Sequence, residues 1–195
     1  LSPTASGKSL IIYMLVRHYM NMINNKILII VPTTSLVEQL YKDFKDYGFD
    51  SETNVSRKYH GYDIDDDKRI VISTWQSLYK MPKKFFEDYG AVIGDEAHLF
   101  KAVSLTKIMT KLTDCKYRIG LTGTLDDSKT NKLVLTGLFG IVNRVVSTKQ
   151  LIDKKQLANL KVVCLNLKYP EEESKKVYGV KYFEELEYLT QNKAR

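Results

Sequence analysis

The chain has 195 residues, of which 44% are hydrophobic and 27% charged, so it can bury one sizeable core with further elements attached. Its 30 Lys and Arg against 23 Asp and Glu leave a formal charge of +7, which suits a polyanionic partner without proving one. Two distant cysteines without a C-x-x-C pattern argue against a disulfide framework or a zinc site and fit a reducing cytoplasm. Every apolar run is too short for a membrane span, so we expect no membrane partner.

The first nine residues, LSPTASGKS, are a candidate phosphate-binding loop that opens a helix. Gly7 lets the backbone turn so that successive N–H groups face one point, Lys8 adds a mobile positive charge, and Ser9 offers a hydroxyl for Mg²⁺. The residues expected to contact a nucleoside triphosphate are Thr4, Ala5, Ser6, Gly7, Lys8, Ser9 and Leu10. A capped helix after a turn is the alternative, supported by Ser2 and Ala5 where glycine is common.

Two alternating elements follow the loop. Residues 10–22 keep apolar side chains in helical phase, and residues 27–31 form an aliphatic run typical of a strand covered on both faces. A phosphate loop normally hangs from a buried parallel strand, and none precedes it here. We therefore expect an N-terminally truncated piece of a longer protein.

The strand at 27–31 ends in Pro32, Thr33 and Thr34, before a helix predicted to reach Gly48 with a capping arrangement from Ser35 to Glu38. Hydroxyls at such a helix start hold either a nucleic-acid phosphate or an ordinary cap.

The acidic run at 63–67 alternates like the first ligands of a calcium loop. Lys68 stands where that loop needs glycine and Thr74 where it needs glutamate, so the run is interpreted as a solvated loop. Residues 69–73 then predict a third strand, followed by a short helix that Pro82 interrupts. Trp75 is interpreted as a packing anchor because apolar Leu78 follows three residues later.

A fourth strand at 89–93 leads into Gly-Asp-Glu-Ala-His. Two adjacent carboxylates at the end of an apolar strand are costly unless a cation or substrate partners them. We expect Asp95 to hold Mg²⁺ together with Ser9, Glu96 to orient or deprotonate the attacking water, and His98 to couple the site to a neighbouring element. An acidic loop is the alternative.

A fifth strand at 117–121 ends in Thr122, Gly123 and Thr124, whose hydroxyls lie beside the phosphates if the sheet is parallel. A helix is predicted at 129–138, an extended stretch at 141–146, a strand at 162–167, and a last amphipathic helix around Phe183 and Leu186. The pattern of residue types along the sequence changes at Ser147, so we expect a domain boundary between residues 146 and 147.

Five segments resemble, in sequence and order, the first-lobe motifs of superfamily-two helicases: SPTASGKS, VPTTSLVEQ, ISTWQSL, GDEAH and GLTGTL. The resemblance covers nearly the whole chain. Further along, GLTGTLDD, GLFG, STKQLID and LKYP are similar to phage recombination and repair helicases, which use ATP to remodel branched DNA. The resemblance implies an α/β RecA-like domain at 1–146, and a bridge with the beginning of a second lobe at 147–195.

The resemblance also implies residue roles and partners. Backbone contacts to DNA are implied for Pro32, Thr33, Thr34, Thr74 and Gln76, and coupling of hydrolysis to movement for His98, Thr122, Thr124 and Arg118. ATP rather than GTP, a second lobe with arginine fingers and a host cytoplasm, if the source is a phage, are implied in the same way. This piece alone is then expected to be nearly inactive.

Three alternatives to a helicase are open. A translocase subunit of a restriction system shares all these motifs and differs in flanking domains. A nucleic-acid-binding module that has lost hydrolysis is disfavoured because Lys8, Asp95 and Glu96 are intact. A small-molecule kinase is disfavoured because the acidic motif and hydroxyl-rich strand end suit attack by water.

Overall fold

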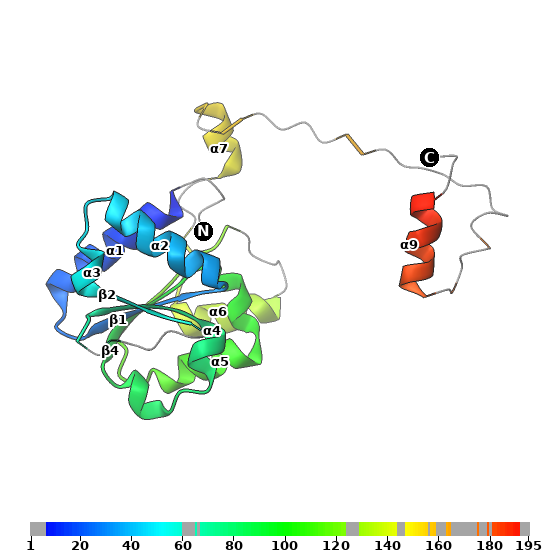
Figure 1. The fold of residues 1–195 in the computed structure, drawn as a ribbon. Coiled ribbons are helices and arrows are strands. Elements are labelled where there is room, and N and C mark those ends of the chain that lie inside the picture. The colour runs from blue at the N-terminus through cyan, green and yellow to red at the C-terminus, as the bar shows by residue number, and fades with distance from the viewer. Residues whose placement is uncertain are drawn as a thin grey trace. The chain divides into compact units, whose positions relative to one another are not determined.

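The computed structural model describes residues 7–59, 65, 67–123, 129–143, 147–155, 157–158, 163–164, 175, 179 and 181–191. The chain divides into two compact units, Leu1–Ala158 and Asn159–Arg195. Figure 1 shows a helix-flanked sheet in the first unit and helix α9 (Tyr182–Gln191) in the second. The expected domain boundary at 146 and 147 stays a prediction.

Five parallel strands form one sheet in the first unit, in the order β2-β3-β1-β4-β5. In chain order the strands are β1 (Lys26–Val31), β2 (Val55–Lys58), β3 (Ile70–Thr74), β4 (Tyr89–Gly94) and β5 (Tyr117–Gly120). Ile30 of β1 is in register with Ser73 on one side and with Gly94 on the other. The carboxyl ends of these strands therefore meet at one edge, where ligands collect in open α/β sheets.

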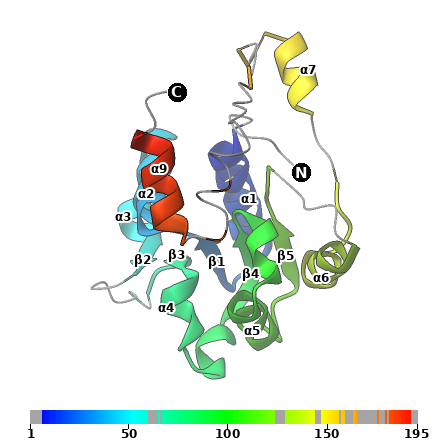
Figure 2. The same cartoon turned by 90° about the vertical axis from the view of Figure 1, so that its right-hand side faces the viewer.

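Helices cover both faces of the sheet (Figure 2). One face carries α1 (Lys8–Met22) and α2 (Thr34–Asp46), whose buried Val16 and Phe44 pack against Ile27 and Ile29 of β1. The other face carries a set of short helices that pack on Leu28 and Ile30: α4 (Trp75–Tyr79), η1 (Lys83–Phe86), η2 (Ala97–Lys101), α5 (Val103–Lys111) and α6 (Lys129–Phe139). Alternate residues of β1 thus face opposite cores, which explains its uninterrupted aliphatic run.

The predicted α/β parallel fold is confirmed, and several local elements differ from the prediction. Strand β2 and the one-turn helix α3 (Ser51–Asn54) before it were not predicted, because β2 is a four-residue edge strand whose Arg57 and Lys58 break any apolar run. The strand predicted at 162–167 lies mostly outside the described residues, and Val163 and Cys164 are not in a strand. Residues 141–143, after α6, do not form a strand. Helix α7 (Thr148–Asp153) begins after Ser147, which forms a capping box with Gln150.

Among the described residues, no helix is both long and apolar enough to cross a membrane.

Candidate nucleotide site and nucleic-acid edge

The phosphate loop runs into α1 through a left-handed turn at Gly7, with φ of 77°. The N–H of Ile11 donates to the Gly7 carbonyl at 3.0 Å, so the amides of Lys8, Ser9 and Leu10 precede the first helical hydrogen bond. Within the described residues no side chain caps this end, and no acidic residue lies in the first turn. These amides and the positive end of the helix dipole suit an anion.

The structure describes only part of the predicted phosphate-binding loop. Thr4, Ala5 and Ser6 lie outside the described residues. Ser9 is half-buried, whereas the Leu10 side chain is 44% exposed.

The acidic motif turns sharply as β4 ends. Asp95 donates its N–H to the Ile30 carbonyl at 2.9 Å, and Ala97 donates to the Leu121 carbonyl at 2.8 Å. Between them, Glu96 adopts a left-handed conformation (φ 48°), which costs a non-glycine residue energy and is typical of functional sites. A Cβ on Gly94 would lie 2.7 Å from the Phe100 ring, so glycine allows this close packing.

The loop lysine and the acidic motif meet directly. The Nζ atom of Lys8 lies 2.8 Å from Oε1 of Glu96, although 88 residues separate them. Both side chains are largely shielded, with exposures of 17% and 29%. The parallel sheet is what brings them together, because α1 starts and β4 ends at the same edge.

Asp95 carries a carboxylate that is short of partners. It is buried, and no described residue hydrogen-bonds its Oδ1 atom. Burial raises the pKa of Asp95 above its ordinary value, while the charges of Lys8 and His98 oppose the shift. An unpartnered, desolvated carboxylate oxygen beside a phosphate loop fits a divalent cation. No cluster of three or more His, Cys, Asp or Glu side chains that could hold a metal ion assembles in the described part of the chain.

His98 joins the acidic motif to the end of β5. Its Nδ1 atom lies 3.3 Å from Oε2 of Glu96 and 2.9 Å from Oγ1 of Thr122. Thr122 is buried, at 6% exposure. A continuous polar chain therefore runs from Lys8 through Glu96 and His98 to Thr122. Thr124 lies outside the described residues.

At the end of β1, Thr33 rather than Ser35 caps α2. Its Oγ1 atom accepts a hydrogen bond from the Leu36 N–H at 3.3 Å, because Thr33 still has the extended backbone of the strand. Thr33 and Thr34 are exposed. Pro32 lines a narrow crevice together with Trp75 and Asp95, which places this strand end beside the acidic motif.

At the end of β3, Thr74 and Gln76 differ. Thr74 is buried at 4% exposure, and its hydroxyl lies 3.1 Å from that of Ser77. The Thr74 side chain therefore contacts the first turn of α4, and its expected DNA contact stays a prediction. Gln76 is exposed, and Trp75 packs against the core as expected. A serine three residues after Thr74 was the signal that could have revealed this contact.

Arg118 contacts the connection between α5 and β5. It lies near the amino end of β5, and its guanidinium donates to the carbonyl of Leu112, the C-cap residue of α5, and to that of Cys115 in the connection. The bond to the Leu112 carbonyl satisfies a group left open at a helix end. In this structure the Arg118 guanidinium is held away from the carboxyl edge, and its expected coupling role stays a prediction.

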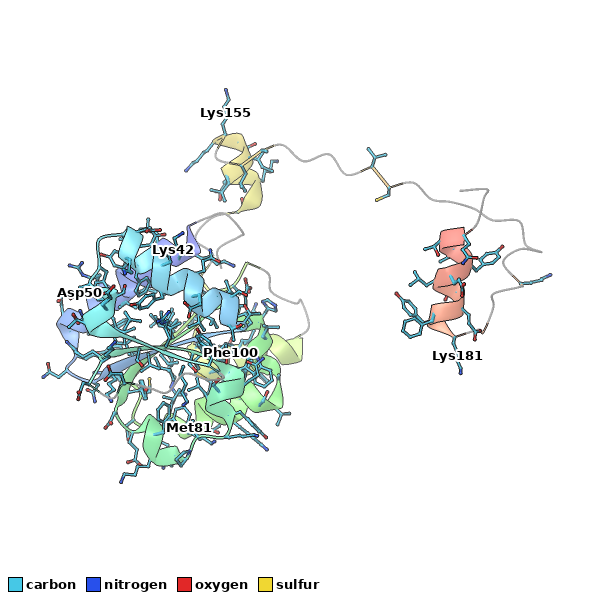
Figure 3. The ribbon with its side chains drawn as sticks, viewed as in Figure 1. Lys42, Asp50, Met81, Phe100, Lys155 and Lys181 are labelled. Atoms are coloured by element: carbon cyan, nitrogen blue, oxygen red, sulfur yellow. The ribbon has the colours of Figure 1, made fainter. Side chains whose placement is uncertain are left out.

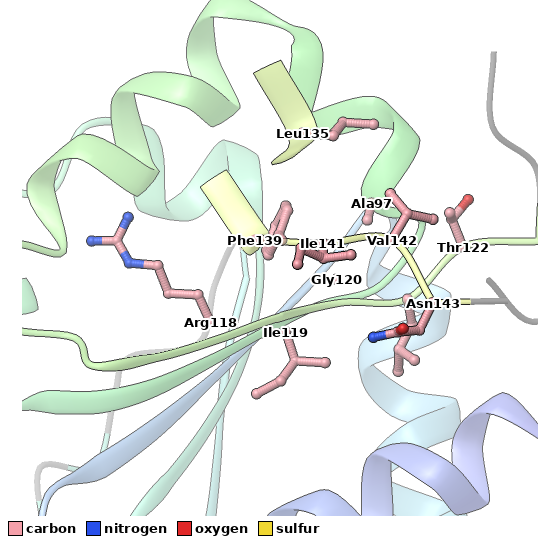
Figure 4. A pocket seen from close by; sticks show the side chains of 12 residues that line it. Ala97, Arg118, Ile119, Gly120, Thr122, Leu135, Phe139, Ile141, Val142 and Asn143 are labelled. Atoms are coloured by element: carbon pink, nitrogen blue, oxygen red, sulfur yellow. The ribbon is translucent and has the colours of Figure 1, made fainter. Parts of the chain in front are cut away.

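An apolar cavity of about 310 Å³ adjoins the Thr122 end of the polar chain. Figure 4 shows Phe139, Ile141 and Val142 around it, with Thr122 at one side and Arg118 pointing away. Neither Lys8 nor Asp95 lines this cavity.

Together, the fold and these motifs define a RecA-like domain of the superfamily-two helicases. A family model described as "Type III restriction enzyme, res subunit" matches residues 1–127. The chain belongs to this family.

Two curated relatives and two solved structures are similar to the chain. It is 38% identical over 192 residues to the ATP-dependent DNA helicase uvsW of Enterobacteria phage T4, covering 96% of this chain and 38% of uvsW. It is 31% identical over 139 residues to the helicase Hel308 of Methanocaldococcus jannaschii, covering 63% of this chain and 12% of Hel308.

A crystal structure of T4 UvsW aligns with a TM-score of 0.67 at 36% identity, covering 97% of this chain and 37% of that one. The Pyrococcus furiosus Hef helicase domain, at 21% identity and TM-score 0.63, shares the fold over 73% of this chain and 33% of its own. The chain thus spans less than two fifths of the curated relatives' length.

Proposed function

We propose that this chain is the first motor lobe of an ATP-dependent DNA helicase or translocase that remodels branched DNA in recombination and repair. The observation that carries the proposal is the 2.8 Å contact between Lys8 and Glu96, because hydrolysis requires a phosphate-binding cation and a carboxylate in one place. The similarity to proteins named ATP-dependent DNA helicases supports ATP as the nucleotide and DNA as the partner.

The lobe's own residues divide the work of hydrolysis. The first-turn amides of α1 and the ammonium of Lys8 hold the outer phosphates and offset their charge. Ser9 and Asp95 would hold Mg²⁺, which would offset the negative charge of the phosphates. Glu96 orients the attacking water and accepts its proton, which requires Lys8 to leave the carboxylate for the phosphates.

Coupling to DNA uses the same edge of the sheet. A change in the contacts of Glu96 reaches Thr122 through His98, since one imidazole nitrogen lies within 3.3 Å of both side chains. The exposed end of β1 with Thr33 and Thr34, together with Gln76 on α4, contacts the DNA backbone. A second RecA-like lobe of the same protein closes on the nucleotide and supplies arginine, so this lobe alone turns over slowly.

A translocase subunit of a restriction system is the second candidate, and the description of the matched family favours keeping it. Both candidates use the same lobe, and they differ in the outcome on DNA.

The test is the ATPase rate of the intact protein with single-stranded DNA, duplex DNA, forked DNA and RNA, scored together with strand separation and cleavage. We expect the greatest stimulation by forked DNA, with strand separation and no cleavage. Cleavage would favour the restriction subunit, and a rate that no nucleic acid changes would contradict both.

A further inference from the structure

Helix α4 carries an exposed face that continues from Gln76 away from the carboxyl edge. Trp75 packs against the core and Leu78 is fully buried, whereas Gln76, Tyr79 and Lys80 are exposed. Positions 76, 79 and 80 are three and four residues apart, so they share one side of the helix. The polar face that begins at a residue expected to meet DNA therefore extends over Tyr79 to a lysine.

A second helix adds a cation beside the same tyrosine. The Nζ atom of Lys107, an exposed residue of α5, lies 6.0 Å from the centre of the Tyr79 ring. Lys111 holds the two helices together, because its Nζ atom donates to the carbonyls of Tyr79 and Met81 at 2.9 and 2.8 Å. Gln76, Tyr79, Lys80 and Lys107 thus form one surface across two packed helices, which we call the lysine track.

The charges of this surface are not neutralised within the described part of the chain. No ion pair there joins Lys80, Lys83, Lys84 or Lys107 to an acidic side chain. The opposite face differs, since Lys45 pairs with Glu52 at 2.6 Å and Arg57 with Glu38 at 2.6 Å. Figure 3 labels Met81 beyond α4, on the other side of the sheet from Lys42 of α2. The acidic residues nearest in sequence, Glu87 and Asp88, follow η1.

We propose that the lysine track is a second contact for the DNA phosphate backbone. It rests on the proposed function, because it extends a DNA path that begins at Gln76. Lys80 and Lys107 bind successive phosphates of one strand as mobile point charges, and Tyr79 between them provides a flat wall for the sugar. Such contacts position the strand without reading bases, so they add affinity that does not depend on sequence.

The test compares two double variants of the intact protein. Lys80→Gln with Lys107→Gln removes the two charges of the track, and Lys42→Gln with Lys132→Gln removes two exposed charges from α2 and α6. Binding is followed by fluorescence anisotropy with two labelled oligonucleotides of unrelated sequence over a range of salt concentrations, and thermal unfolding by circular dichroism confirms folding.

We expect the track variant to bind both oligonucleotides about tenfold more weakly at low salt, with a salt slope smaller by about 0.7 to 0.9 for each phosphate that is no longer neutralised. The α2/α6 variant binds like the wild type, and Lys80→Arg with Lys107→Arg restores affinity because charge is what matters. Wild-type affinity and slope in the track variant would overturn the lysine track alone. A wild type that binds neither oligonucleotide would overturn the proposed function and the track with it.

Discussion

The carboxyl edge of the sheet has two ends that are built differently. At the β4 and β5 end, side chains meet over long sequence separations: Lys8 with Glu96 across 88 residues and His98 with Thr122 across 24. At the β1 and β3 end, the hydroxyls of Thr33 and Thr74 bond to groups only three residues away. Nucleotide hydrolysis requires side chains from distant parts of the sequence to meet, so it depends on the whole sheet. Contact with a DNA backbone requires only exposed residues at the starts of helices. Substitutions at the first end should therefore change turnover, and those at the second should change affinity or local stability.

The largest effect is expected for Lys8→Ala in the intact protein. Removing the ammonium takes away the main positive charge facing the outer phosphates and leaves Glu96 without its partner. DNA-stimulated ATP hydrolysis should fall by about a thousandfold. Lys45→Ala, which removes an exposed paired lysine of α2, is the control and should retain the wild-type rate. Equal rates for the two variants would remove the phosphate-site assignment.

Glu96→Gln should separate binding from hydrolysis. The amide keeps the shape of the side chain but cannot accept the proton of the attacking water, so turnover should drop by about a hundredfold while nucleotide affinity persists. A fluorescent nucleotide titration and a phosphate-release assay measure the two quantities. Glu38→Gln alters a carboxylate that pairs with Arg57 and should leave both unchanged. Loss of nucleotide binding in Glu96→Gln would mean that Glu96 has a structural role instead.

Thr122→Val tests the link between the two ends. The valine fills the same buried space but breaks the 2.9 Å contact with His98. The ratio of DNA-stimulated to basal ATPase should fall by about tenfold, as for loss of a typical coupling free energy. Thr106→Val is the matched control, because within the described residues that hydroxyl bonds to the carbonyls of Phe100 and Ala102 and not to His98. An unchanged ratio in Thr122→Val would break the proposed coupling path.

Asp95→Asn should raise the melting temperature without nucleotide. Burial holds the pKa of Asp95 above its ordinary value, so the folded state binds a proton more tightly than the unfolded state. The contribution of Asp95 to stability is thus lost as pH rises through the raised pKa, and the variant avoids this loss. Its advantage should be greatest at neutral pH and shrink in acidic buffer, as followed by thermal unfolding. The magnesium nucleotide should stabilise the wild type but not the variant, and the opposite order would contradict the cation site.

The smallest effect is expected at the other end, for Thr33→Ala. Loss of the cap on α2 should lower the free energy of unfolding by about 1 kcal/mol, measured by urea denaturation. Ser35→Ala, one residue into the helix, should change it by much less. A larger effect of Ser35→Ala would restore the capping arrangement expected from the sequence.

Motif residues at the nucleotide end were predictable because each type is tied to one chemistry. Lysine and serine after Gly7, and two carboxylates after an apolar strand, suit few roles besides phosphate and metal binding, and the structure brings Lys8 to Glu96. Thr74 and Arg118 were harder to assign. A threonine hydroxyl and a guanidinium serve equally well as local hydrogen-bond partners. Here Thr74 bonds to Ser77, and Arg118 bonds to carbonyls between α5 and β5.

The sequence by itself determined the alternation of strands and helices, the buried character of β1 and β4, and the residue types of the phosphate loop and the acidic motif. Those features depend on periodicity and on short-range turn chemistry, which neighbouring residues carry. Only the tertiary structure decided the order β2-β3-β1-β4-β5, the edge position of β2, the link from Glu96 through His98 to Thr122, and the uncompensated lysines of α4 and α5. These depend on which distant side chains share an edge or a face, and packing of the whole sheet sets that.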